Sequence, residues 1–158
     1  MTNILFVCLG NICRSPMAEF VFRDLVQKQG LGEQFHVASA ATSTEELGNP
    51  VHPGTRRRLA QEGISTWGKT AVQLCRRDYQ KYHWLIGMEQ RNVSGMLRIL
   101  GGDPEGKVRR LLDFTPSPRD IADPWYTGDF NRTYDDILEG CQGLLDYLLE
   151  EEAPLSRN

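Results

Sequence analysis

Hydrophobic positions along the chain follow two spacings that alternate from one end to the other. Short apolar runs bounded by polar residues, glycine or proline are typical of buried strands. Between these runs, apolar residues recur every three or four positions, which is typical of a helix that packs one face on a sheet. The runs predict four strands, at residues 4–7, 34–39, 83–88 and 108–114.

The segments with helical spacing predict the helices that cover this sheet. The first helix is predicted to start at Ser15-Pro16, because serine is a favoured N-cap and proline a favoured first helical residue, and to end at Gly30. Thr55 is predicted to cap the second helix. Further helical segments are expected at 55–62, 77–79, 93–100 and 132–151, and residues 153–158 are expected to fray. This alternation predicts an α/β fold of three layers, a twisted four-stranded parallel sheet with helices on both faces.

Length and composition are those of one globular domain, which we place at residues 1–158. The net charge of −3 gives no general attraction for nucleic acid, so nucleic acid is not expected among the partners. No apolar run approaches the ~18 residues that a membrane-spanning helix needs, and no secretory signal is recognisable. The four cysteines lack metal-ligand spacing and do not form the pattern of a secreted disulfide framework. The sequence therefore predicts a cytoplasmic protein with reduced thiols, no membrane partner, no metal and no other cofactor.

The chemistry is expected in the turn between the first strand and the first helix. Cys8 lies at the end of the strand, and Arg14 follows six positions later. A turn this short curls its backbone N–H groups inward, toward the point where the helix also directs its positive end. The sequence therefore predicts an anion site the size of a phosphate, with a thiol at its floor and a guanidinium on its wall. The residues expected to bind the phosphate are Leu9, Gly10, Asn11, Ile12, Cys13, Arg14 and Ser15.

Cys8 is the candidate nucleophile, because the N–H donors, the start of the helix and Arg14 all favour thiolate over thiol. Arg14 suits a phosphate because its guanidinium can donate to two phosphoryl oxygens at once, which a lysine cannot do. Ser15 is placed to donate a hydrogen bond to the sulfur and help it to leave. The reaction implied is phosphoryl transfer to Cys8, followed by transfer to water.

A second catalytic element is expected between the fourth predicted strand and the last helix. An oxygen leaving group of poor acidity needs a proton when the P–O bond breaks, and a carboxylic acid on a neighbouring loop can supply it and then act as base for water. Asp120 and Asp123 are the candidates, and we favour Asp123 because Pro124 fixes the backbone that follows it. Trp125 and Tyr126 are expected to form walls of the pocket, where their aromatic faces could flank a flat group of the substrate.

Residues 8–15, Cys-Leu-Gly-Asn-Ile-Cys-Arg-Ser, resemble the signature of the low-molecular-weight protein tyrosine phosphatases, and residues 123–126 resemble the general-acid loop of that family. The resemblance covers nearly the whole chain. It implies a flavodoxin-like fold of the phosphotyrosine phosphatase I type. It also implies hydrolysis of phosphotyrosine and aryl phosphate monoesters through a phospho-cysteine on Cys8, with Arg14 binding the phosphate and Asp123 as general acid and base.

The same resemblance implies roles for residues that support the loop. Asn11 and Ser39 would form a hydrogen bond that holds the Cys8 loop in a strained shape, with Ser15 as a further support. The alternative interpretation of Ser39 is a simple cap at the end of a strand. Cys13 would form a reversible disulfide with Cys8 and so shelter the nucleophile from over-oxidation, and its alternative interpretation is a residue that only fills the loop.

The chain departs from the family pattern at two places. Glu45-Glu46 stand where the family usually presents an aromatic or other specificity-setting side chain. Glu45 is therefore expected in the pocket wall, and an acidic rim would disfavour peptides with acidic residues beside the phosphate. A histidine often supports the Cys8 loop in the family from the place that Lys69 occupies here.

The expected partner is a phosphotyrosine protein, such as a tyrosine kinase, with inorganic phosphate, sulfate and vanadate as competitive ligands. An alternative function is a thiol-dependent arsenate reductase, which uses the same fold and anion loop but needs a relay of resolving cysteines. Cys75 is the only candidate for the first partner in such a relay, and no second cysteine follows closely. A third function is a phosphate-binding regulatory module, but the presence of Cys8, Arg14 and Asp123 together argues against it.

Overall fold

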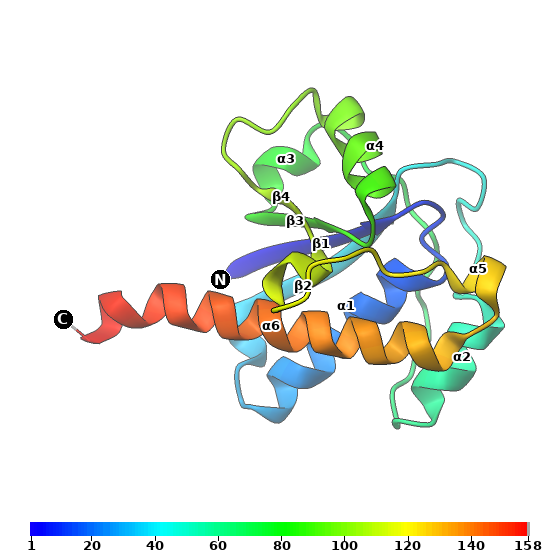
Figure 1. Cartoon of the computed structure of the whole chain (residues 1–158), viewed down its shortest axis with the longest axis horizontal. Helices are drawn as coiled ribbons and strands as arrows, with labels where there is room; N and C mark the ends of the chain where they lie inside the picture. The colour runs from blue at the N-terminus through cyan, green and yellow to red at the C-terminus, as the bar shows by residue number, and fades with distance from the viewer. Residues whose placement is uncertain (158) are drawn as a thin grey trace.

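A parallel sheet of four strands forms the centre of the protein (Figure 1). The computed structural model describes residues 1–157, and it describes the side chains of residues 1–151. The strands lie in the order β2-β1-β3-β4, and each neighbouring pair is parallel, which confirms the predicted sheet. The strands are β1 (Thr2–Cys8), β2 (Phe35–Ala41), β3 (Trp84–Gly87) and β4 (Val108–Arg110).

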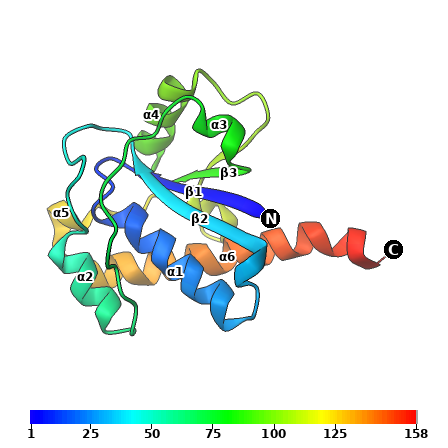
Figure 2. The ribbon, with the colours of Figure 1, turned by 180° about the vertical axis from the view of Figure 1, so that it is seen from behind.

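Helices cover both faces of this sheet, as the alternating pattern predicts (Figures 1 and 2). Helices α1 and α6 lie on one face with α2 beside them, and α3 and α4 lie on the other face, so the three-layered α/β fold is confirmed. None of the helices in the described part of the chain is long and apolar enough to span a bilayer. The helices are α1 (Arg14–Lys28), α2 (Pro53–Ala60), α3 (Asp78–Lys81), α4 (Gln90–Leu100), α5 (Pro124–Thr127) and α6 (Phe130–Arg157), with 3-10 helices η1 (Gly32–Gln34) and η2 (Leu111–Phe114).

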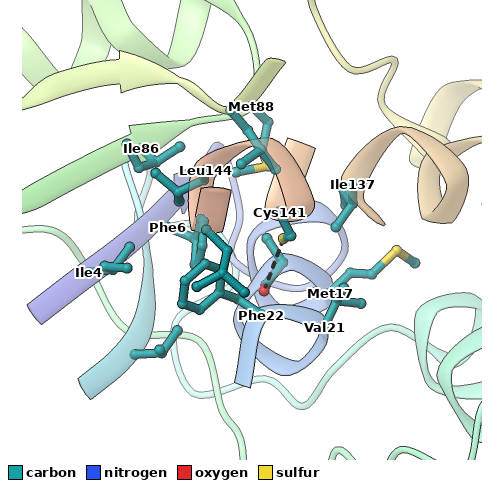
Figure 3. Close-up of a cluster of buried hydrophobic side chains, with 14 of the residues drawn as sticks. Ile4, Phe6, Met17, Val21, Phe22, Ile86, Met88, Ile137, Cys141 and Leu144 are labelled. Carbon is teal, nitrogen blue, oxygen red and sulfur yellow. Dashed lines mark hydrogen bonds between the residues drawn. The ribbon is translucent and has the colours of Figure 1, made fainter. Parts of the chain in front are cut away.

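The side chains of β1 alternate between two hydrophobic clusters, because successive residues of a strand point to opposite faces of the sheet. Ile4 and Phe6 belong to the larger cluster, which packs α1 and α6 on the sheet (Figure 3). Leu5 and Val7 belong to the second cluster, which lies under α3 and α4. Both faces of β1 are therefore buried, which explains why its sequence is a continuous apolar run.

Cys141 belongs to the core, as its place on the apolar face of the last predicted helix indicates. Its side chain is fully buried, and its thiol lies 3.8 Å from the carbonyl oxygen of Ala18 in α1 (Figure 3). The residue behaves here as a small hydrophobic group with a weak donor. It therefore serves the contact between α6 and α1.

At two helix starts, the residue predicted as the cap does not cap the helix. α1 begins at Arg14 and not after a capping Ser15, because the Ser15 hydroxyl is used against the sulfur of Cys8. α2 begins at Pro53, and the side chain of His52 accepts its capping hydrogen bond. Thr55 was expected at this cap, but it lies inside the helix and is fully buried. Proline at the start of α2 marks the true helix start.

The last third of the chain holds three further differences. The strand predicted at 108–114 ends at Arg110 and continues as η2, because a short apolar run that is buried does not distinguish a strand from a helical turn. The short helix α5 was not predicted. α6 is longer at both ends than the predicted range of 132–151. Of the residues expected to fray, those up to Arg157 are assigned to α6, and Asn158 lies outside the described residues.

The loop after β1 lies where the order of the strands reverses. From β1 the chain continues to β2 on one side, and β3 lies on the other side of β1. Ligands of open α/β sheets bind outside the carboxyl ends of the strands at such a point. Residues 9–13 therefore occupy the position where this architecture places a binding site.

Candidate active site

The sulfur of Cys8 is surrounded by hydrogen-bond donors at the end of β1. The Sγ atom lies 3.0 Å from Oγ of Ser15, 3.3 Å from the backbone nitrogen of Asn11 and 3.4 Å from that of Ser15. Both backbone N–H groups donate to the sulfur. The loop therefore directs two backbone N–H groups and a hydroxyl at one point, the sulfur at the end of β1.

Asn11 gives the loop its shape. Its φ angle of 57° is the only positive one among the non-glycine residues that the structure describes. Asparagine is one of the few residues that enter this left-handed region. Its side-chain amide donates to Oγ of Ser15 at 2.8 Å and to Oγ of Ser39 at 2.9 Å, and its Oδ1 accepts from the backbone nitrogen of Val72 at 3.1 Å. The structure thus contains the contact between Asn11 and Ser39 that the resemblance implies, and the side chain holds the strained backbone in place.

A buried charged group lies behind Ser39. The Ser39 hydroxyl donates to Oε1 of Glu19 at 2.6 Å, and Arg23 donates to Oε2 of the same carboxylate at 2.7 Å. Lys69 donates to the carbonyl oxygen of Ser39 at 3.0 Å and lies 3.8 Å from Glu19. Burial lowers the pKa of the Lys69 ammonium, and the charge of Glu19 opposes this effect. Lys69 therefore joins the network that reaches the Cys8 loop through Ser39 and Asn11.

Glu19 was not identified from the sequence. It lies within α1 and is 6% exposed. Its signal in the sequence is an acidic residue on the face of a helix that otherwise buries apolar side chains, and such a residue is buried only when it has partners.

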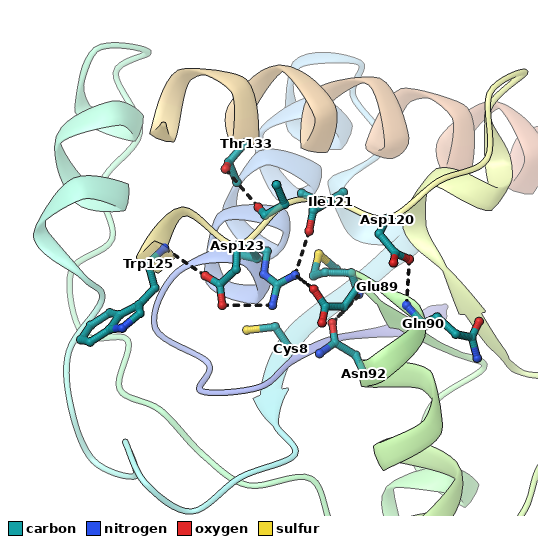
Figure 4. A network of polar contacts seen from close by, with 12 residues as sticks. Cys8, Glu89, Gln90, Asn92, Asp120, Ile121, Asp123, Trp125 and Thr133 are labelled. Carbon is teal, nitrogen blue, oxygen red and sulfur yellow. Dashed lines mark hydrogen bonds and ion pairs between the residues drawn. The ribbon is translucent and has the colours of Figure 1, made fainter. Parts of the chain in front are cut away.

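The guanidinium of Arg14 is 2% exposed and is held by three acceptors. Its Nη1 donates to Oε2 of Glu89 at 2.7 Å and to the carbonyl oxygen of Ile121 at 2.8 Å, and its Nη2 lies 3.4 Å from Oδ2 of Asp123 (Figure 4). Burial alone would lower the pKa of Arg14, but the charges of Cys8 and Asp123 and the hydrogen bond to Glu89 outweigh burial and raise it. Arg14 thus remains a cation inside the site.

Glu89 is the second residue that sequence reasoning missed. It lies between β3 and α4, at the carboxyl edge of the sheet, and its backbone N–H donates to Oδ1 of Asn92 at 3.1 Å. An acidic residue directly after a buried strand of a parallel sheet was the available signal, because the carboxyl ends of such strands meet at one edge.

The two candidate acids differ in their surroundings (Figure 4). Oδ1 of Asp123 accepts from the backbone nitrogen of Trp125 at 3.0 Å, which makes Asp123 the N-cap of α5, while its other oxygen faces Arg14. Asp120 accepts from the backbone nitrogen of Gln90 at 2.8 Å and from Arg110 at 3.1 Å. Asp120 is therefore bound between the start of α4 and the end of β4, whereas Asp123 faces the arginine of the site.

A cavity of about 140 Å³ opens above the sulfur of Cys8. Glu45 and Glu46 reach it from the loop after β2, and Trp125 and Tyr126 reach it from α5. These two aromatic side chains are exposed, at 56% and 80%. The complete lining is Cys8, Leu9, Gly10, Ile12, Cys13, Arg14, Ser43, Glu45, Glu46, Asp123, Trp125 and Tyr126.

Cys13 also lines this cavity, as a free thiol. Burial raises its pKa to about 12, and the charges of Cys8 and Asp123 act in the same direction. Cys75, the only candidate for a thiol relay, is half-buried and donates to Asp78, and it is not part of the cavity lining. Within residues 1–157, no group of three or more His, Cys, Asp and Glu side chains could hold a metal ion.

The chain matches a family model described as "Low molecular weight phosphotyrosine protein phosphatase" over residues 3–154. It is 40% identical over 154 residues to the Bacillus subtilis low molecular weight protein-tyrosine-phosphatase YfkJ, covering 96% of this chain and 99% of YfkJ. The crystal structure of YfkJ superposes with a TM-score of 0.93 and covers 96% of this chain and 97% of that one.

More distant relatives agree with this match. The Staphylococcus aureus low molecular weight protein-tyrosine-phosphatase PtpA is 33% identical over 152 residues and covers 96% of both chains. The crystal structure of DARP, a Drosophila arginine phosphatase, superposes with a TM-score of 0.83 at 29% identity and covers 94% of this chain and 98% of that one. The protein therefore belongs to the low-molecular-weight phosphotyrosine protein phosphatases, a family of hydrolases.

Proposed function

We propose that the protein hydrolyses phosphotyrosine and other aryl phosphate monoesters through a phospho-cysteine on Cys8. The observation that carries this proposal is the convergence on one cavity of a sulfur that accepts two backbone N–H groups, a buried arginine and a carboxylate. Nucleophile, anion holder and proton donor are the three parts that a two-step phosphoryl transfer requires. Cys8, Arg14 and Asp123 supply them.

In the first step the phosphate lies in the loop, held by Arg14 and by the backbone N–H groups of residues 9–15. The thiolate of Cys8 attacks phosphorus, an S–P bond forms, and the P–O bond to the aryl group breaks. Asp123 donates its proton to the departing phenolate oxygen, which leaves as a phenol. Donors that are already aligned stabilise the charge that develops on the phosphoryl oxygens.

In the second step water attacks the phospho-cysteine. Asp123, now a carboxylate, takes a proton from the attacking water, and inorganic phosphate leaves with the former S–P bond electrons remaining on the sulfur. The Ser15 hydroxyl, 3.0 Å from Sγ, is placed to donate to the sulfur as its negative charge returns. Asn11 and Ser39 support the loop in both steps through the hydrogen bonds of the Asn11 side chain.

The substrate that fits best is a phosphotyrosine side chain on a protein, of which a tyrosine kinase is one example. Trp125 and Tyr126 form the wall against which a phenyl ring would pack, and Glu45 also lines the cavity. Phosphate and sulfate would compete as simple tetrahedral anions. Vanadate would bind more tightly, because it can adopt the five-coordinate shape of the transition state.

Cys13 is proposed as the residue that protects the nucleophile. A peroxide would oxidise the Cys8 thiolate to a sulfenic acid, and the thiol of Cys13 would then displace water and form a disulfide. Two external thiols would reduce this bond and restore both cysteines. After peroxide treatment and thiol reduction, Cys13→Ser should recover less activity than the parent, and equal recovery would reject this role.

The test of the proposed function is rapid-quench measurement of phosphorus bound to the protein during turnover of para-nitrophenyl phosphate. We expect bound phosphorus in the parent and none in Cys8→Ser. Arg14→Ala should abolish turnover, and Asp123→Asn should slow phenyl phosphate more than dinitrophenyl phosphate, while Asp120→Asn should not show this difference. A protein with no trapped phosphorus, or one that acts only on phosphoarginine or on arsenate with a thiol reductant, would overturn the proposal.

A further inference from the structure

We propose that His52 is a positioning residue that fixes the segment of Asp123 against the Cys8 loop. Its backbone would bind the Cys8 loop through a hydrogen bond. Its ring would pack against the aromatic side chains around α5. The inference rests on the proposed role of Asp123 as general acid. His52 precedes α2, which lies beside α5 in both views of the protein (Figures 1 and 2).

The first contact of this segment is with the backbone of the loop. The His52 N–H donates to the carbonyl oxygen of Ile12 at 2.9 Å, and the hydroxyl of the fully buried Thr55 donates to that of Cys13 at 3.3 Å. In a trans peptide the N–H points away from the C=O of the same unit. Holding these two carbonyls against α2 therefore turns the N–H groups of Cys13 and Arg14 away from α2. Both residues line the cavity.

The second contact is with the segment that carries the acid. The His52 ring stacks on Phe130 with centroids 5.3 Å apart and an angle of 20°, and it meets Trp125 edge-on at 5.7 Å and 76°. Trp125 in turn donates its backbone N–H to Oδ1 of Asp123. A short path of contacts thus joins the acid to Ile12: Asp123, Trp125, His52, Ile12.

The ring of His52 has a fixed orientation. Its Nδ1 accepts a hydrogen bond from the backbone nitrogen of Gly54 at 3.0 Å, which caps α2. Gly54 is needed here for close approach, since a Cβ at this position would lie 2.3 Å from the Phe130 ring. Phe130, the first residue of α6, therefore packs directly on the backbone of α2 and closes the aromatic group around His52.

The chain on both sides of Asp123 is held in place. Other contacts hold the residues before Asp123, and His52 holds those after it. Before the acid, Ile121 donates to the carbonyl oxygen of Met88 at 3.0 Å, and the carbonyl oxygen of Ile121 accepts from Arg14 at 2.8 Å. After the acid comes the four-residue α5, whose Trp125 side chain is more than half exposed. Trp125 contacts the ring of His52, and this contact joins the exposed α5 to the segment that binds the phosphate loop.

Two variants separate the ring from the cap. His52→Asn keeps an oxygen that can accept from Gly54 but removes the ring, and His52→Phe keeps a flat ring but removes the acceptor. General acids contribute a factor of about 10² to 10⁴, so a misplaced acid should lower kcat/KM for phenyl phosphate by about tenfold or more in His52→Asn. For dinitrophenyl phosphate, which needs no proton, the loss should stay within about twofold, and His52→Phe should lose little with either substrate.

The dependence on Asp123 is tested by a double-mutant cycle. If His52 acts through the acid, His52→Asn in an Asp123→Asn background should add no further loss with phenyl phosphate. An equal loss with both leaving groups, or an additive loss in the cycle, would overturn the role of His52. If Asp123→Asn alone lowers kcat/KM equally for phenyl phosphate and dinitrophenyl phosphate, the proposed role of Asp123 as the acid is instead overturned. Phe130→Leu removes the stacking ring from the other side and carries the same test if His52→Asn does not fold.

Discussion

Nη1 of Arg14 lies 2.7 Å from Oε2 of Glu89, so a residue that follows β3 orients the arginine of the phosphate loop. The same nitrogen also donates to the carbonyl oxygen of Ile121. These two acceptors fix one edge of the guanidinium. The other nitrogen, Nη2, is left on the side of Asp123 and the cavity.

Glu89→Ala should weaken phosphate binding, because Arg14 then loses the acceptor that sets its direction. A misplacement of about 1 Å can cost about 10²-fold in rate, so we expect kcat/KM to fall by about 10- to 100-fold. Glu89→Gln keeps an oxygen acceptor, so its kcat/KM should fall far less. The measurements are kcat/KM for para-nitrophenyl phosphate and the inhibition constant of inorganic phosphate. An alanine variant with the parent's inhibition constant would show that Glu89 does not orient Arg14.

The sequence allowed the fold and the central residues of the site to be predicted for two physical reasons. Strand and helix spacings are local, and the parallel sheet follows from their alternation. Cys8 and Arg14 lie at the two ends of one short turn, so their proximity is also a local property. The choice of Asp123 needed the family resemblance as well, because two aspartates stand in the same loop. Only the structure shows that Asp120 binds Arg110 and Gln90.

The contacts that were missed join segments far apart in the chain. Glu89 reaches Arg14 across 75 positions, and Glu19 reaches Ser39 across 20 positions. No periodicity reports such pairs, because they depend on how finished elements pack. The error at 108–114 has a different cause: the buried residues that follow Arg110 are as apolar in a 3-10 turn as in a strand.

Gly143→Ala should destabilise the protein, although alanine is the better helix former. A Cβ at Gly143 would lie 2.3 Å from the backbone oxygen of Phe114 in η2, and backbone cannot move aside as a flexible side chain can. Overpacking of this kind costs about 1–3 kcal/mol. Gly95→Ala is the matched control, because its Cβ would lie 3.4 Å from Thr42 and the change should be neutral or stabilising by up to about 1 kcal/mol. Urea unfolding of both variants decides the point, and equal effects would contradict the close approach.

Cys13 should make the protein less stable at alkaline pH. Burial raises the pKa of its thiol from 9.0 to about 12, so between these values the unfolded chain has lost a proton that the folded protein keeps. The free energy of unfolding therefore falls as pH rises through this window, by up to about 1.4 kcal/mol per pH unit for one proton. Below the window the thiol is protonated in both states, and none of this stability has been lost. Cys13→Ser should flatten this fall when urea unfolding is followed from pH 8 upward. Parallel curves for parent and variant would exclude the effect.

The charges around the mouth of the cavity are mainly negative. Glu45, Glu46 and Asp123 line it, and Arg14, the only cation in the lining, is already paired with Asp123 and Glu89. Glu46 is held in place, since its Oε2 accepts from the side-chain amide of Asn49 at 2.7 Å. A peptide that brings its phosphate to Cys8 must therefore pass the carboxylates of Glu45 and Glu46, of which Glu46 is held in place.

Phosphotyrosine peptides with lysine or arginine beside the tyrosine should be better substrates than peptides with acidic flanks. An exposed ion pair contributes about 0.2–1 kcal/mol. Each favourable contact should therefore raise the kcat/KM of the peptide by up to about fivefold, when the value for para-nitrophenyl phosphate serves as the reference. The preference should shrink in a Glu45→Gln, Glu46→Gln double variant and also in about 1 M salt, where charges are screened within about 3 Å. Glu33→Gln removes an exposed charge in η1, at the opposite edge of the sheet, and should leave the preference intact. If the double variant retains the parent's ratio between basic and acidic peptides, the two carboxylates do not select the substrate, and a preference that persists at high salt must come from packing rather than from charge.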